Sequence, residues 1–471
     1  MTAPSSITLT WVVVVVAPFV APGLLGVARA ESPQEELMKL KKSVESMQKT
    51  IDEQDKKIQE IEKAQAQAPP PAMSPAAAAE VTQPASPVTH RPALNDEQEP
   101  APRPDDLTLE PEYRGFLPIP NTGVMIRFNA RPRTDFTYDT KNSGDDNRFI
   151  PAKIPVTGDP NAGGRPIANV NAKGTRLSID VRAPLSEGSP RFFYLNDFFG
   201  SGSDEFNFRV RHLYGQIYNV IVGETYGVFE DPDIWPDTVD CKGPNSMILV
   251  RNPLVHYQRR LGDQWLATVG VEKPDSSPDG VDVSGVNHAP DGGFNLRWEK
   301  AKVGHAQFAA VFRDIGARSA TFGDHEALGW GTNLSATFDV FTGDTLLGQA
   351  TYGEGIGSLG NDTTTFNTDA AFDSHGNLVA LPYMGAFAGY THKWADAWRS
   401  TASYGFVNID PQASQGPDAY RRTHYASVNL VWQLRKRLSV GVEVLYGRKE
   451  TQSNAKGDVV RTQVGMVYSI F

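Results

Sequence analysis

The last fourteen residues, DVVRTQVGMVYSIF at 458–471, alternate between hydrophobic and polar side chains. Val460 and Met466 share one face of such a segment, whereas Arg461 and Gln463 share the other. Successive side chains of a β-strand point to opposite faces, so the pattern predicts a strand that is apolar on one side. Soluble β-sandwiches and membrane β-barrels both contain such strands. Recurrence of the pattern along the chain decides between the two.

The same alternation recurs from position 123 onward and predicts about sixteen strands. The expected ranges are 124–139, 173–183, 190–199, 205–217, 219–229, 246–258, 264–273, 292–300, 303–314, 326–339, 344–353, 382–394, 398–408, 420–433, 436–448 and 459–471. The connections between the predicted strands are alternately short and long, and only the connection at 200–204 breaks this alternation. Membrane barrels have short turns at one end and longer loops at the other. We therefore predict an all-β fold, a transmembrane antiparallel β-barrel over residues 123–471.

An export signal is predicted at residues 1–30. Its apolar core, WVVVVVAPFVAPGLLGV at 11–27, is followed by ARA at 28–30, a small-x-small cleavage motif. No Lys or Arg precedes Trp11, so an uncleaved anchor is the alternative. Beyond this segment no apolar run is long enough for a membrane helix, and any membrane residence is expected to be through strands.

Residues 31–63 are predicted to form an α-helical coiled coil. Hydrophobic side chains recur at intervals of three and four residues, and the segment 34–63 contains neither Gly nor Pro. The core positions are Leu37, Leu40, Val44, Met47, Ile51, Gln54, Ile58 and Ile61. About four heptads cannot bury this stripe alone, which favours association of helices, and we expect a homotrimer. A single amphipathic helix lying on another surface is the alternative.

The segment 64–122 is predicted to be a periplasmic linker. It opens with an Ala-, Pro- and Gln-rich stretch that runs to position 104. Such a composition does not form a packed core and gives a semi-extended spacer between the coiled coil and the barrel.

Composition and charge argue against several function classes. The formal net charge is −10 and the isoelectric point is near 5.5, which gives no support for nucleic-acid binding. A single cysteine, Cys241, excludes an internal disulfide and a cysteine-cluster metal site. The histidines are scattered without a persuasive partner, and GEGIG at 353–357 lacks the strand-to-helix context of a phosphate loop. We expect no enzyme, no cofactor and no metal.

Arginines dominate the polar face of the predicted strands. An arginine that faced lipid near the midplane would cost roughly 2–4 kcal/mol, so these side chains are expected to point into the lumen. The expected pore-lining and anion-binding residues are Arg127, Arg131, Arg133, Arg176, Arg209, Arg211, Arg251 and Arg297. Ladders of arginine favour anionic permeants. The alternative is an internal salt-bridge lattice with Asp135, Asp180, Glu272 and Glu299, which can coexist with selectivity.

The third long loop is acidic. It follows the fifth predicted strand, reads EDPDIWPDTVDCKGPN, and its carboxylates are Glu230, Asp231, Asp233, Asp237 and Asp240. If this loop folds into the lumen, it forms a constriction in which carboxylates face guanidiniums, and the resulting transverse field orients dipolar solutes. The alternative is that the carboxylates only solvate an external tip.

Several short motifs resemble the DcaP-like trimeric porins, whose barrels follow a periplasmic coiled coil. They are GFLPIPNTG, RVRHLYGQ, VGETYGVFEDPDIWPDTVDCKGPNS, VRNPLVHYQ, VGVEKPDS and ATYGEGIG. The likeness covers nearly all of residues 115–471. It implies a trimer of sixteen-stranded barrels that pass small anions, dicarboxylates in the best-known member. It also implies a constriction at 231–240 and a basic wall of Arg131, Arg133, Arg209, Arg211 and Arg251.

The chain departs from the family pattern at three places. Pro132 interrupts the first strand, Cys241 stands where an apolar residue is expected, and Tyr468 lies three residues before the terminal Phe471 instead of two. The family's substrate preference therefore does not transfer directly to this chain.

Together these features predict a bacterial outer-membrane porin for passive diffusion of small, preferentially anionic solutes. The expected partners are further copies of the chain, outer-membrane lipid and the solutes themselves, but not nucleic acid. A structural anchor that tethers the envelope to peptidoglycan through residues 31–104 is the alternative.

Overall fold

The computed structural model of the chain describes residue 49 and residues 115–183, 188–201 and 206–470. Apart from residue 49, the predicted signal peptide (1–30), the predicted coiled coil (31–63) and most of the predicted linker (64–122) lie outside the described residues. Among the residues described, no helix combines the length and the apolar composition of a membrane span.

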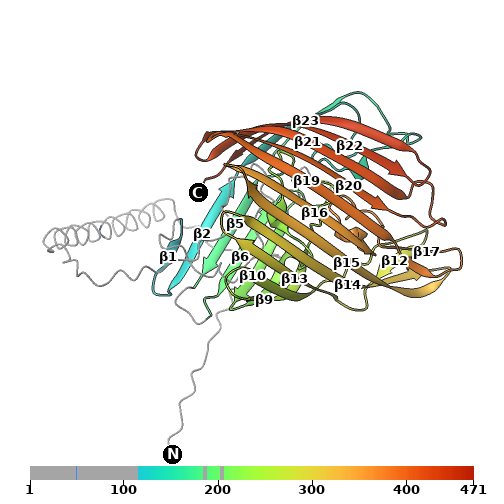
Figure 1. The fold of residues 1–471 in the computed structure, drawn as a ribbon, viewed down its shortest axis with the longest axis horizontal. Coiled ribbons are helices and arrows are strands. Elements are labelled where there is room, and N and C mark those ends of the chain that lie inside the picture. The colour runs from blue at the N-terminus through green and yellow to red at the C-terminus, as the bar shows by residue number, and fades with distance from the viewer. Residues whose placement is uncertain (1–48, 50–114, 184–187, 202–205, 471) are drawn as a thin grey trace, which may run out of the picture. The chain divides into compact units, whose positions relative to one another are not determined.

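Antiparallel β-strands make up most of the described chain (Figure 1). The first half contains β1 (Leu117–Ile119), β2 (Val124–Arg131), β3 (Arg133–Asp139), β4 (Ile167–Asn171), β5 (Arg176–Arg182), β6 (Arg191–Asp197), β7 (Arg209–Ile217), β8 (Val220–Tyr226), β9 (Arg251–Arg260), β10 (Trp265–Glu272), β11 (Pro278–Asp279) and β12 (Val283–Val286). The second half contains β13 (Asp291–Lys300), β14 (Gly304–Ser319), β15 (Gly323–Val340), β16 (Asp344–Glu354), β17 (Ala370–Phe372), β18 (Leu378–Ala380), β19 (Pro382–Ala395), β20 (Trp398–Ile409), β21 (Tyr420–Arg435), β22 (Leu438–Thr451) and β23 (Lys456–Tyr468).

One large sheet contains twenty of these strands. From β5 to β10, and then from β13 through β16 and β19 to β23, each strand pairs antiparallel with the next. At the ends of this series, β5 pairs with β2, and β23 pairs with β3. In Figure 1 the long strands β14 to β16 and β19 to β23 lie side by side.

Pro132 divides the first predicted strand into β2 and β3. Proline has no backbone N–H to donate to a sheet and is confined to edges and irregular positions. The two halves then pair with different neighbours, because β2 lies against β5 whereas β3 lies against β23 and β4. A single interrupted strand therefore connects the beginning of the sheet with its end.

The hydrophobic alternation of the sequence becomes two different faces of the sheet. In β3 the side chains of Arg133 and Asp135 are buried, whereas those of Phe136 and Tyr138 are exposed. In β23 Arg461 is buried and Met466 is exposed in the same way. We call the side of Arg133 and Arg461 the inner face and the side of Phe136 and Met466 the outer face. An apolar outer face with a polar inner face is the arrangement of strands in membrane barrels.

Tight turns join many neighbouring strands at the positions predicted to be short. Tyr218 between β7 and β8, Lys302 between β13 and β14, and Phe341 between β15 and β16 all have positive φ, at 50°, 62° and 52°. Left-handed residues of this kind supply the twist that a two-strand hairpin needs. Because these three residues are not glycine, their positive φ strains the backbone, and the hydrogen bonds between the flanking strands must offset that strain.

Several predicted long loops contain additional short strands. β4 lies in the predicted loop 140–172, β11 and β12 lie in 274–291, and β17 and β18 lie in 354–381. A separate sheet of three strands pairs β11 with β17 and β17 with β18. The two loops at 274–291 and 354–381 are thus joined by backbone hydrogen bonds.

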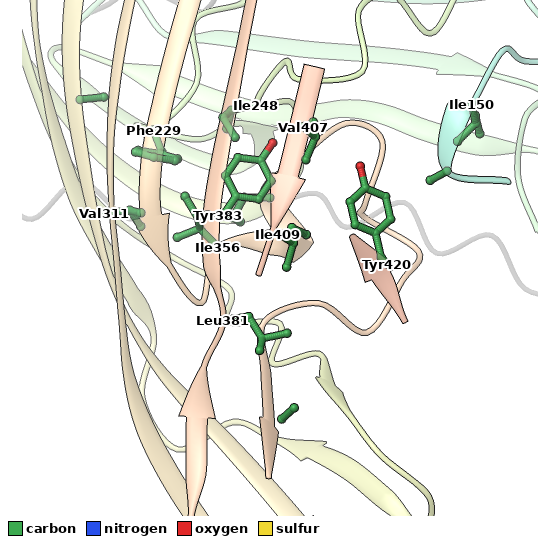
Figure 2. Packing of buried hydrophobic residues seen from close by; sticks show 14 residues of the cluster. Ile150, Phe229, Ile248, Val311, Ile356, Leu381, Tyr383, Val407, Ile409 and Tyr420 are labelled. Atoms are coloured by element: carbon green, nitrogen blue, oxygen red, sulfur yellow. The ribbon is translucent and has the colours of Figure 1, made fainter. Parts of the chain in front are cut away.

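Three long loops pack together against the inner face (Figure 2). Ile150 comes from the loop after β3, Phe229 and Ile248 come from the loop between β8 and β9, and Ile356 comes from the loop after β16. Strand residues, among them Val407 of β20, complete the cluster. Burial of each such side chain contributes roughly 1.5–3 kcal/mol to folding stability, so the cluster holds the loops to one another and to the large sheet.

Candidate functional site

The loop between β8 and β9, residues 227–250, is here called the third loop. A single carboxylate holds both of its ends, because Glu230 accepts hydrogen bonds from the backbone N–H of Gly227 at 2.7 Å and of Val250 at 2.9 Å. A second carboxylate, Glu272 of β10, accepts from the N–H of Val228 at 2.6 Å. Burial, together with the nearby charge of Glu272, raises the pKa of Glu230 to about 8.

The first acidic turn of the third loop is anchored on β13, β14 and β15. Asp231 accepts from Arg297 at 3.0 Å, from Ser335 at 2.6 Å, and lies 2.8 Å from the ring nitrogen Nε2 of His305. Burial opposes ionisation of Asp231, but the charges of His305 and Arg297 hold its pKa below the usual range. Asp233 forms a second ion pair with Arg297 at 2.7 Å. One buried guanidinium therefore binds two loop carboxylates.

The second half of the third loop is anchored on β20 and β22. Asp237 forms an ion pair with Arg399 of β20. The backbone N–H of Asp240 donates to Glu443 of β22 at 2.6 Å, and the Asp240 carboxylate accepts from the N–H of Phe149 at 3.2 Å. Burial raises the pKa of Asp240, although the charge of Arg461 acts in the opposite direction.

The third loop therefore runs from one part of the inner face to another with all five of its predicted carboxylates held by the protein. Trp235, at the middle of the loop, is 1% exposed and packs with Leu347 and Phe387 of the wall. The backbone carbonyl of Val239 accepts from Arg133 of β3. These contacts connect the loop to three separate regions of the large sheet.

Most of the predicted arginines lie on another part of the sheet, the strands β2 to β7. These strands carry eight arginines and four aspartates, and we call them the arginine sector. The arginines are Arg127, Arg131, Arg133, Arg176, Arg182, Arg191, Arg209 and Arg211. One of the aspartates, Asp139, is bound by Arg461 of β23 at 2.7 Å, so guanidiniums outnumber the remaining carboxylates.

Two aspartates of the arginine sector are each surrounded by several guanidiniums. Arg182 and Arg191 approach Asp180 to 3.0 and 3.1 Å. Arg127 approaches the same carboxylate to 3.4 Å. Arg209 and Arg211 donate to Asp197 at 2.8 and 2.9 Å, and Arg176 interacts with Asp197 electrostatically. Each cluster therefore carries an excess of positive charge.

Arg131 and Arg176 lie directly opposite each other in the pairing of β2 with β5. Arg176 is buried and Arg131 is partly buried. Like charges placed directly opposite across two strands repel. An anion that lies between or beside the two guanidiniums offsets this repulsion and lowers the electrostatic energy of the pair.

Arg251 lies outside the arginine sector. It begins β9, where the alternation groups it with the exposed Val255 and not with the buried His256. Its guanidinium lies over the ring of Tyr226, 5.5 Å from the ring centroid. Tyr226 is 2% exposed, and the charge of Arg251 acts on the buried carboxylate of Glu230, so Arg251 lies close to the start of the third loop.

The sequence analysis missed several partners of the third loop. Arg399, Glu443 and Arg461 bind or face the loop from strands that follow it by more than one hundred residues. Alternation places Arg461 on the polar face of the last strand, so its inward direction could have been predicted. Its proximity to Asp240 depends on the fold and has no local signal.

Comparisons with known proteins agree with this architecture. A family model described as DcaP outer membrane protein matches residues 113–470. The crystal structure of the outer membrane channel DcaP of Acinetobacter baumannii has a TM-score of 0.67 at 22% identity, covering 74% of this chain and 98% of that chain. An anion-selective porin from Comamonas acidovorans has a TM-score of 0.48 at 13% identity, with 74% and 100% covered. No curated protein sequence matches the chain.

The family match spans the larger part of the chain and includes every strand described above. The likeness to the DcaP channel extends over nearly all of that chain and shows that the two share a porin-type fold. The resemblance predicted from short motifs is confirmed, and the chain belongs to the DcaP outer membrane protein family.

Proposed function

We propose that the large sheet closes into a barrel of sixteen strands that spans the outer membrane. The pairing of β23 with β3 supports closure, since β3 continues from β2 through Pro132. The number follows from the twenty strands of the sheet when β2 with β3, and β4 with β5, are each counted once and β1 and β12 are treated as extensions. Closure leaves no unpaired strand edge in lipid.

We further propose that the barrel is a porin for passive diffusion of small, preferentially anionic solutes. The observation that carries this proposal is the excess of guanidiniums in the arginine sector, with Arg131 opposite Arg176. A wall with fixed positive charge in a confined lumen concentrates anions and repels cations. Dicarboxylates, which could contact both Arg131 and Arg176, are the solutes we propose first.

The third loop is proposed to narrow the lumen. This proposal is supported by the hydrogen bonds and ion pairs that hold the loop to β13, β14 and β15, to β20 and β22, and to Arg133 of β3. Arg297 and Arg399 bind Asp231, Asp233 and Asp237, and burial raises the pKa of Glu230 and Asp240, so the loop carries less negative charge than its five carboxylates would give. The positive field of the arginine sector then dominates the permeation path, and the transverse field is weaker than an uncompensated acidic loop would give.

A homotrimer is the proposed assembly. Its support is the heptad pattern at 31–63, which needs neighbouring helices to bury its apolar stripe.

Reversal potential in a salt gradient tests the proposed selectivity. We expect Arg131→Gln combined with Arg176→Gln to lower the ratio of anion to cation permeability. At about 7 Å in water a unit charge contributes about 0.6 kcal/mol to the energy of a permeating ion, so each removed charge changes anion entry on the order of twofold.

Arg259→Gln is the matched control, since Arg259 lies on the exposed side of β9 and carries the same charge. An unchanged permeability ratio in the double variant, or an equal decrease in the control, would contradict the arginine mechanism.

A further inference from the structure

Three side chains that belong to different segments meet on the outer side of β14 and β15. His288 comes from the connection between β12 and β13, Asp314 from β14, and Glu326 from β15. The ring nitrogen Nδ1 of His288 lies 3.1 Å from Oε1 of Glu326 and 3.9 Å from Oδ2 of Asp314. One ligand atom from each residue lies within 4.8 Å of the other two. β12 pairs with the last residues of β14, at one end of the long strands (Figure 1).

Strand register explains why the two carboxylates share a face. Arg313 and Ile315 of β14 are buried on the inner side, so Asp314 between them points to the other side. Glu326 is opposite Gly316 in the pairing of β14 with β15. Residues offset by two positions on paired strands are diagonal neighbours, which places Asp314 and Glu326 within reach of each other.

Gly316 makes room for the imidazole ring. A Cβ atom at this position would lie 2.8 Å from Cε1 and 2.9 Å from Nδ1 of His288. The ring therefore rests directly against the backbone of β14, and its position is limited by packing. A Cβ atom at 316 would also lie 2.4 Å from the backbone carbonyl oxygen of Val286, so a larger residue there would displace both the connection after β12 and the ring of His288.

The charges of this group are not balanced within it. Two carboxylates face one imidazole, and the nearby guanidinium of Arg318 donates to a different carboxylate, Asp324, at 2.8 Å. Side-chain exposure is 38% for His288, 30% for Asp314 and 61% for Glu326. Charged side chains on the outer face are costly in lipid, so this end of β14 and β15 is expected to lie beyond the membrane, where an ion from solvent can reach all three. A cation at the centre would relieve the repulsion between the two carboxylates.

We propose that His288, Asp314 and Glu326 bind a divalent transition-metal cation of the Zn²⁺ type. A nitrogen ligand together with carboxylates suits Zn²⁺ and its neighbours, whereas Ca²⁺ and Mg²⁺ prefer oxygen ligands alone. Metal–ligand distances of about 2.0–2.2 Å put ligand atoms of a tetrahedral site about 3.3–3.5 Å apart, a spacing bracketed by the 3.1 and 3.9 Å separations found here.

Three protein ligands leave one coordination position open. An open hollow of about 570 Å³ lies beside the group and is lined by Asp314 and Glu326 together with Phe312 and Leu328. The fourth position is accessible from this hollow, so water or an anionic group from solvent can complete the coordination. The sequence analysis predicted no metal, because positions 288, 314 and 326 have no recognisable ligand spacing.

Titration calorimetry of the untagged, detergent-solubilised full chain with Zn²⁺ tests the proposal. We expect one saturable site per chain, and we expect His288→Ala and the double variant Asp314→Asn, Glu326→Gln each to weaken it by more than about tenfold. His375→Ala is the control, since His375 is exposed and has one acidic neighbour, Asp373, at 3.7 Å.

Two outcomes would overturn the proposal. One is the lack of a saturable site in the wild type, and the other is an affinity that falls equally in the His375 control or stays unchanged in His288→Ala. Far-ultraviolet circular dichroism of each variant shows whether the β-fold is retained. These readouts do not depend on conductance, so failure here leaves the proposed porin function untouched.

Discussion

Individual residues in the third loop show how burial sets protonation. Glu230 accepts two backbone hydrogen bonds at the ends of the loop, and its pKa of about 8 lies well above that of an ordinary glutamate. The folded protein therefore binds the proton of Glu230 more tightly than the unfolded chain. The resulting stabilisation is full below about pH 4.5 and is lost as the pH rises toward 8.

Hydrogen exchange of the loop amides, corrected for intrinsic rates, tests this assignment. We expect protection near Gly227 and Val250 to decrease between pH 6 and pH 9 in the wild type, because ionised Glu230 is buried near Glu272. Glu230→Gln cannot ionise and should show little change over the same range. Glu354→Gln serves as a control carboxylate substitution. An equal pH response in wild type and Glu230→Gln would refute the role of Glu230.

At the scale of elements, residue patterns predicted strand type better than strand boundaries. The alternation of apolar and polar residues in β3 and β23 correctly predicted which side chains share the apolar face, because Phe136 and Met466 are both exposed. Pro132 was recognised as a departure, but its consequence, that β2 and β3 pair with different strands, depends on neighbours distant in the chain. Short strands such as β4 and β17 escaped prediction because three to five residues carry too little periodic signal.

The anchored third loop provides a prediction at the same scale. Asp231→Asn should weaken a buried pair and leave Arg297 and His305 without a charged partner at that position. Removal of one member of a buried ion pair costs on the order of 3 kcal/mol, so protection of the loop amides should fall about a hundredfold.

Asp324→Asn is the matched comparison, because its pair with Arg318 is exposed and such pairs contribute little. Loop protection that is equal in the two variants would show that Asp231 is not an anchor.

At the scale of the whole molecule, the pairing of β23 with β3 makes closure testable by cross-linking. Tyr138 and Thr462 are direct partners in this pairing, and directly opposed strand residues have the separation that a disulfide needs. In a Cys241→Ala background, Tyr138→Cys with Thr462→Cys should form a disulfide under mild oxidation. Peptide mass spectrometry identifies the cross-link.

The control pairs Tyr138→Cys with Val444→Cys. Val444 of β22 is the partner of Thr462 and therefore lies one strand farther from β3. Two strand spacings, about 9.5 Å, are too long for a disulfide. Cross-linking in the control but not in the test pair would exclude the proposed closure.

The sequence alone determined the two-faced character of the strands and the chemical type of the inner face. Both follow from side-chain alternation, which is local, and from the high cost of exposing guanidiniums to lipid. The family, too, was predicted from short motifs and is confirmed by the match over residues 113–470.

Only the tertiary structure decided which charges compensate one another. Asp231 meets Arg297 and His305, Asp237 meets Arg399, and nothing in the spacing of these residues specifies the contacts. The same holds for His288, whose acidic neighbours belong to two other segments. Ion pairs need the two charged groups within about 4 Å of each other in space, so their partners are fixed by strand register and loop packing and not by distance along the chain.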